Sequence, residues 1–137
     1  MKPLAPLAAL ALLLAAAAAE AGDPEAGEGL FNRCRACHMI EGGGETIVRG
    51  GPTGPNLYGV IGRRAGSVAG FDYGDSLAEA GEAGLVWTEE TLAAYVSDPR
   101  KFLSERLGGR ARSNMTYKLR RGGEDVAAYL AQFGAGG

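Results

Sequence analysis

Two cysteines and the only histidine of the chain stand together in the segment Cys34-Arg35-Ala36-Cys37-His38. If this segment is helical, its two cysteines lie about one turn apart on the same face. Both sulfur atoms can then form thioethers with the two vinyl groups along one edge of a porphyrin, while the adjacent imidazole binds the iron. The spacing is that of the c-type haem attachment motif. It predicts one covalently bound haem c held by Cys34 and Cys37, with His38 as a metal ligand.

Three other kinds of site contain two cysteines at this spacing: a thioredoxin-like redox pair, a structural disulfide and half of a zinc site. A thioredoxin-like pair belongs in a βαβ context, which the sequence lacks. A structural zinc ion needs four ligands, and the chain offers only three cysteine or histidine side chains. Covalent haem attachment takes place in exported proteins, so the predicted export of this chain favours haem over all three.

A methionine is the candidate for the second axial position of the iron, because the chain has no second histidine. Of the three methionines, Met1 leaves with the predicted export signal, and Met39 is adjacent to His38 and cannot reach the opposite face of the porphyrin. Met115 remains, in a polar, glycine-bearing loop over residues 108–117 that is a poor place for a core methionine. Ligation by His38 and Met115 closes the iron and raises its potential, which predicts electron transfer without a substrate.

Two other functions stay open on these residues alone. A bond between a thioether and iron is breakable, so a haem enzyme or gas-binding protein with an open sixth iron position is one alternative. A haem module acting as a fixed subunit of an oxidoreductase is the other, because it would use the same ligands. Slow binding of carbon monoxide by the ferrous protein distinguishes the carrier from the open-site protein.

The N-terminus has the pattern of a signal peptide over residues 1–21. Lys2 precedes an uncharged, Leu/Ala-rich stretch, and Ala19 and Ala21 put small residues at the two positions that a signal peptidase reads. We expect cleavage after Ala21, which leaves a periplasmic domain of residues 22–137. An uncleaved membrane anchor is the alternative, but alanine is only weakly lipophilic and no stop-transfer flank follows.

The composition fits one globular domain with a large cofactor. The 137 residues carry 14 Lys+Arg against 16 Asp+Glu, and 46% of them are hydrophobic. These values do not fit a disordered tail, and the absence of a long basic run argues against a nucleic-acid binder. The chain also contains 23 glycines, many of them between residues 42 and 74. Loops this rich in glycine lose much entropy when they become ordered, so we expect a large buried cofactor on which they pack.

Three segments with helical spacing predict an all-α fold of short helices and long loops. The first runs over residues 23–34 and opens with a capping aspartate followed by proline. The second runs over residues 88–98, begins with a capping threonine and is stopped by Pro99. The third runs over residues 124–133 after the pair Gly122-Gly123, and Gly134 ends it.

The chain resembles the class I cytochromes c, close to the bacterial cytochrome c2 group, over nearly all of residues 22–137. Besides the haem motif, the matching segments follow one another in the family's order. They are Gly54-Pro55-Asn56-Leu57-Tyr58-Gly59, Gly62-Arg63, Phe71-Asp72-Tyr73, Trp87-Thr88-Glu89-Glu90, Tyr95, Asp98-Pro99, Met115 and Glu124-Asp125-Val126-Ala127-Ala128-Tyr129-Leu130.

This resemblance implies a class I cytochrome c fold wrapped around one covalently bound haem. It also implies a soluble periplasmic electron carrier rather than an enzyme. Such a carrier takes single electrons from a bc1-type complex to a photosynthetic reaction centre or a cytochrome oxidase. We expect a monomer that docks transiently at these membrane complexes.

The resemblance further implies roles for residues around the haem. The Pro55 carbonyl accepts a hydrogen bond from the His38 ring, and Tyr95 touches the Met115 sulfur. The side chains implied to donate to the haem propionates are Arg63, Tyr73 and Trp87. The ordinary alternatives are a turn proline, aromatic residues of the core and, for the arginine, a solvated surface charge.

Gly27, Phe31 and Tyr129 resemble the family's crossing of the first and last helices, where a glycine lets two backbones approach. The stretches 41–51 and 104–112 resemble insertions of the larger bacterial members. We predict no function for either stretch beyond that of a surface loop.

Basic residues flank both predicted ligand segments. They are Arg33 and Arg35 beside Cys34, and Arg110, Arg112, Lys118, Arg120 and Arg121 around Met115. Acidic residues gather elsewhere, at Asp72, Asp75, Glu79, Glu82, Glu89 and Glu90. Charged runs are usually just solvated, but this separation predicts a basic face around the haem edge that steers it towards an acidic partner.

Overall fold

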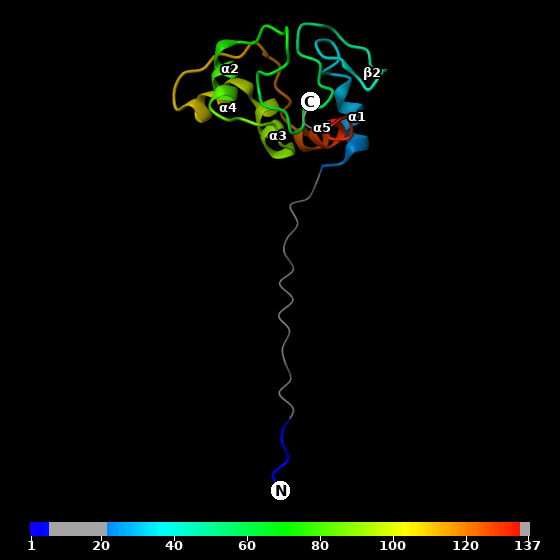
Figure 1. Ribbon diagram of the computed structural model, residues 1–137, viewed down its shortest axis with the longest axis vertical. Coiled ribbons are helices and arrows are strands. Elements are labelled where there is room, and N and C mark those ends of the chain that lie inside the picture. The colour runs from blue at the N-terminus through cyan, green and yellow to red at the C-terminus, as the bar shows by residue number, and fades with distance from the viewer. Residues whose placement is uncertain (6–21, 135–137) are drawn as a thin grey trace.

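Short helices joined by long loops dominate the computed structural model, which describes residues 1–5 and 22–134. Its helices and strands are α1 (Pro24–Phe31), β1 (Ile40–Gly42), β2 (Glu45–Val48), α2 (Asp75–Glu82), α3 (Glu89–Ser97), α4 (Pro99–Leu107) and α5 (Gly123–Leu130). Figure 1 shows α1, α3 and α5 together along one side of the molecule, with β2 on one flank and α2 with α4 on the other. The helical fold class predicted from the sequence is confirmed.

The predicted signal peptide lies, for residues 6–21, outside the described residues. None of the helices in the described part of the chain has the length and apolar character needed to cross a membrane.

The first and last helices, α1 and α5, begin within one residue of the predicted start and end earlier than predicted. Asp23 caps α1 by accepting a hydrogen bond from the Glu25 N–H at 3.0 Å. After Phe31 the chain continues in tighter turns, in which the Cys34 N–H donates to the Phe31 carbonyl at 2.8 Å. The same happens after α5, where the Phe133 N–H donates to the carbonyl three residues before it at 3.1 Å. The helical spacing of apolar residues continues through these tighter turns. A prediction based on that spacing therefore makes both helices too long.

Two helices, α2 and α4, were not predicted. Pro99 does stop α3, but it also occupies the first position of α4, where its fixed φ is favourable. In α4 only Pro99 and Leu103 are buried, and in α2 only Ala80 and Gly81 are. So few buried positions give no clear apolar period. The first part of the predicted insertion at 104–112 therefore belongs to α4.

The other predicted insertion, 41–51, contains all of the antiparallel pair β1–β2 except Ile40, the first residue of β1. Gly43 and Gly44 form its turn with φ of 61° and 81°, a conformation that favours glycine. Strands of three and four residues are too short to show an alternating pattern. The all-α prediction therefore missed this hairpin.

The crossing of α1 and α5 holds the two ends of the domain together. A Cβ atom at Gly27 would overlap the Asp125 carbonyl and lie 2.8 Å from the Cβ of Tyr129. Phe31 packs on Tyr129 with ring centroids 5.7 Å apart. The close approach of backbones predicted for Gly27, Phe31 and Tyr129 is confirmed, and it fixes where the haem motif begins.

The crossing predicts opposite effects for two glycines of α1. Gly27→Ala should lower the free energy of unfolding by about 1–3 kcal/mol, because the new methyl group overlaps α5. Gly29→Ala is the matched control, since no atom lies within 4 Å of its Cβ position, and its better helix propensity should stabilise the protein by up to about 1 kcal/mol. Urea unfolding of the holoproteins measures both changes. Equal stability of the two variants would contradict the crossing.

Candidate haem site

The haem motif forms hydrogen-bonded turns directly after α1. The N–H groups of Cys37 and His38 both donate to the Cys34 carbonyl, at 3.1 and 2.9 Å. Both thiols are free, with Cys34 half-buried and Cys37 exposed. Burial raises the pKa of the Cys34 thiol to about 11, and the neighbouring Cys37 adds to the shift. The turns therefore bring two thiols and an imidazole together, as attachment to one porphyrin edge requires.

The Pro55 carbonyl fixes the imidazole of His38, with its oxygen 2.9 Å from Nδ1. A carbonyl oxygen only accepts hydrogen bonds, so Nδ1 carries the hydrogen and Nε2 carries the lone pair. Burial lowers the pKa of His38, while the hydrogen bond to Pro55 opposes the shift. The ring is therefore neutral at neutral pH, with Nε2 available to bind a metal ion.

Protein side chains alone do not complete a metal site. Among the described residues, no three His, Cys, Asp or Glu side chains lie close enough together to hold a metal ion. The zinc alternative therefore has no support in this structure.

Glycines let the loop after the hairpin close on the haem motif, and none of them was predicted as a site residue. A Cβ atom would clash with the His38 carbonyl at Gly50 and with the Ala36 carbonyl at Gly51. At Gly54 it would overlap the His38 ring. Only glycine allows such an approach. The glycines themselves are visible in the sequence, but nothing there indicates what they contact.

Asn56 and Arg63 hold the loop that presents the Pro55 carbonyl. The Asn56 amide donates to the Glu41 carbonyl at 2.7 Å, and its oxygen accepts from the N–H groups of Glu41 and Tyr58 at 3.0 and 3.1 Å. Arg63 Nη1 donates to the carbonyls of Asn56 and Tyr58, both at 3.2 Å. Arg63 is only 9% exposed, so it is not a solvated surface charge, and burial lowers the pKa of its guanidinium.

The other two predicted propionate donors lie in different surroundings. The Tyr73 hydroxyl accepts a hydrogen bond from the Val68 N–H at 3.0 Å, so its own hydrogen remains for another acceptor. Tyr73 also lies near enough to Arg63 to raise the pKa of that guanidinium. Trp87 is buried and packs on Tyr95 with ring centroids 4.9 Å apart. Contact of any of the three with propionates stays a prediction.

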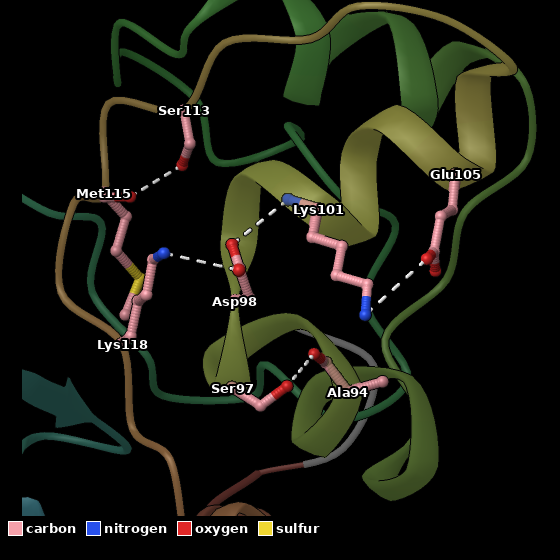
Figure 2. Close-up of polar contacts among 8 residues, drawn as sticks. All are labelled: Ala94, Ser97, Asp98, Lys101, Glu105, Ser113, Met115 and Lys118. Atoms are coloured by element: carbon pink, nitrogen blue, oxygen red, sulfur yellow. Dashed lines mark hydrogen bonds and ion pairs between the residues drawn. The ribbon is translucent and has the colours of Figure 1, made fainter.

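Met115 lies half-buried in the loop between α4 and α5, beside the start of α4 (Figure 2). Ser113 Oγ donates to the Met115 carbonyl at 2.8 Å. Burial raises the pKa of Tyr95, and a hydrogen bond with the Ser113 side chain opposes the shift. Tyr95 therefore lies near Ser113, a residue that the sequence did not indicate. Its predicted contact with the Met115 sulfur stays a prediction.

The charged side chains predicted to guide docking are all exposed. This holds for the basic residues around Cys34 and Met115 and for the acidic residues assigned to the rest of the surface. Lys118 has an acidic partner, because its Nζ lies 3.3 Å from Oδ2 of Asp98. The exposure leaves both groups accessible to a partner protein.

Comparison with known proteins gives close relatives, although no protein-family model matches the chain. The chain is 61% identical over 112 residues to cytochrome c-551 of Roseobacter denitrificans, a match that covers 80% of each protein. It is 52% identical over 126 residues to cytochrome c2 of Rhodobacter capsulatus, covering 90% of this chain and 92% of that protein. The solved structure of cytochrome c2 from Rhodobacter capsulatus superposes with a TM-score of 0.79 at 53% identity, covering 80% of this chain and 97% of the other.

The contact between Gly54 and the His38 ring predicts the effect of a single methyl group. Gly54→Ala should displace the ring from the Pro55 carbonyl, which makes the imidazole less basic and raises the reduction potential. The same overlap should lower the free energy of unfolding by about 1–3 kcal/mol. Gly109→Ala is the control, because no atom lies within 4 Å of its Cβ position. Redox titration and urea unfolding of the holoproteins test the expectation, and parental values for the Gly54 variant would refute it.

Proposed function

The chain belongs to the class I cytochromes c of the cytochrome c2 type, which are mono-haem electron carriers and not enzymes, and we propose a specific route for its electrons. It takes them one at a time from a membrane-bound bc1-type complex and carries them through the periplasm. It delivers them to a photosynthetic reaction centre or a cytochrome oxidase.

Members of this family bind one covalently attached haem c, and the residues described above fit that group. We infer that Cys34 and Cys37 hold it through two thioethers, with His38 Nε2 and the Met115 sulfur as the metal ligands. The hydrogen bond of 2.9 Å between His38 and Pro55 carries this inference. It leaves a neutral imidazole with Nε2 available, one position after two free thiols. When bound, the haem iron supplies one-electron exchange between its ferrous and ferric states.

The residues of this chain then keep the site closed and its geometry constant. Pro55 holds His38 in one orientation, and with the haem bound Met115 would serve as the second protein ligand, so that peroxide, nitric oxide and carbon monoxide would find no open site. A thioether ligand favours the ferrous state and raises the potential. Two fixed ligands keep the geometry similar in both oxidation states, which suits electron transfer.

We further infer that Arg63, Tyr73 and Trp87 donate hydrogen bonds to the haem propionates, which need donors once they are withdrawn from water. Arg63 uses Nη1 for two backbone carbonyls, and its guanidinium has further N–H groups for an anion. The Tyr73 hydroxyl already accepts from Val68 and keeps its own hydrogen. These arrangements support the assignment.

Export and docking complete the proposal. The signal-peptide pattern of residues 1–21 supports cleavage after Ala21 and a mature periplasmic monomer of residues 22–137. The exposed basic residues around the two ligand segments support transient docking on an acidic surface, and such steering raises association rates by roughly 10- to 10³-fold.

Removing the Met115 sulfur tests the ligand assignment. Met115→Leu keeps the apolar volume but should abolish the sulfur-to-iron absorption band, lower the reduction potential and let the ferrous protein bind carbon monoxide rapidly. Met39→Leu should leave all three properties unchanged, because this methionine is adjacent to His38 and cannot reach the opposite face. A Met115 variant that retains the band would overturn Met115 as the ligand, and a parent protein that binds carbon monoxide rapidly would favour the open-site alternative.

Reversing the charge of two basic residues tests the docking surface. Arg120→Glu together with Arg121→Glu should slow association with the electron acceptor at low salt and leave the reduction potential nearly unchanged. Reversal of Glu89 and Glu90 to lysine is the matched control and should not slow association. Flash-induced or stopped-flow kinetics at several salt concentrations measure the rates. Equal rates for the arginine variant and the parent would rule out a docking role for these two residues.

A further inference from the structure

The segment that carries Met115 has few backbone anchors. In the described part of the chain, residues 110–118 form no backbone–backbone hydrogen bond. The first such bond after them joins the Leu119 N–H to the Val96 carbonyl at 2.8 Å. Side chains therefore hold this segment, and segments of this kind open at low free-energy cost.

Side-chain contacts anchor the segment on both sides of Met115. On the N-terminal side, the Ser76 hydroxyl accepts a hydrogen bond from the Arg112 N–H at 3.0 Å. On the C-terminal side, Lys118 Nζ lies 3.3 Å from Asp98 Oδ2. Figure 2 shows Lys118 reaching from the segment to Asp98, which stands at the junction of α3 and α4.

Asp98 is well placed to serve as a fixed anchor. Its Oδ1 accepts a hydrogen bond from the Lys101 N–H at 3.2 Å and caps α4, while its Oδ2 faces Lys118. The bond from the Lys101 N–H, together with Lys118 and Arg100, lowers the pKa of Asp98, although desolvation acts against them. The carboxylate is thus charged at neutral pH, and the helix cap orients it with Oδ2 towards Lys118.

We propose that the ion pair between Asp98 and Lys118 is a clamp that keeps the Met115 segment closed, with Asp98 acting as a positioning residue for the sulfur ligand. The proposal rests on the proposed ligation by Met115. It also changes the role of Lys118, which the sequence assigned to the basic docking face. Asp98 neutralises the charge of Lys118, so Lys118 contributes little to a basic docking face. We therefore assign Lys118 to closing the site and leave docking to basic residues such as Arg120 and Arg121.

Competition by imidazole for the ferric iron tests the clamp, because imidazole can bind only when the Met115 segment opens. The variants are Asp98→Asn, which keeps an acceptor for the α4 cap, Lys118→Gln, and the two combined. Each single variant should bind imidazole about two- to fivefold more tightly than the parent at low salt, as expected for an ion pair that is partly exposed. The double variant should bind no more tightly than the tighter single variant, since the second change has no partner left to remove.

Matched controls separate the clamp from general loss of charge or stability. Arg120→Gln removes an exposed charge close to the segment, and Lys101→Gln removes one from α4; both should retain parental imidazole affinity. Lys118→Arg should also retain it, because arginine preserves the charge. High salt should raise the imidazole affinity of the parent towards that of Asp98→Asn and Lys118→Gln, because salt screens the ion pair. The sulfur-to-iron band should vanish at a lower temperature in the Asp98 and Lys118 variants than in the Arg120 variant.

Two different results would overturn the proposal at different levels. Parental imidazole affinity in Asp98→Asn and Lys118→Gln, or effects of the two that multiply in the double variant, would overturn the clamp alone. A parent protein without the sulfur-to-iron band would overturn ligation by Met115, and the clamp with it.

Discussion

The hydrogen bond between the His38 ring and the Pro55 carbonyl joins the two parts of the chain that build the site. It sets the tautomer of the imidazole, fixes the direction of Nε2 and links the haem motif to the loop that follows the hairpin. The rest of the loop serves this contact: Gly54 lets it lie against the ring, while Asn56 ties it to Glu41 and Arg63 ties it from the other side. A buried arginine and a side-chain amide thus hold the loop that orients the proposed iron ligand, His38.

The unusual abundance of glycine follows from the same constraint. The helices are only eight or nine residues long and offer little area for packing. Loops therefore pack directly against the haem motif and against one another. At Gly50 the chain approaches the His38 carbonyl, and at Gly27 one helix approaches another, each closer than any side chain permits. The crossing of α1 and α5 then fixes the point from which the turns of the motif start.

The candidate ligands could be proposed from the sequence because their chemistry depends on rare residues at fixed spacing. One histidine after two cysteines and one methionine at a distance leave few alternatives, and the crossing residues Gly27 and Tyr129 could be assigned by resemblance. The helices α2 and α4 were missed, because they bury too few side chains to give an apolar period. The links through Asn56 and Ser113 were not predictable either, since a polar residue in a loop gives no indication of its partner until the chain has folded.

The two faces of the site differ in how the chain holds them. The His38 face is enclosed by backbone contacts and glycines with no room for a side chain, whereas residues 110–118 form no backbone–backbone hydrogen bond in the described structure. On the first side the backbone itself leaves no room for change, whereas on the second a few side-chain contacts hold the segment. Under the proposed ligation, a single side-chain substitution can therefore loosen the methionine side while the histidine side stays in place.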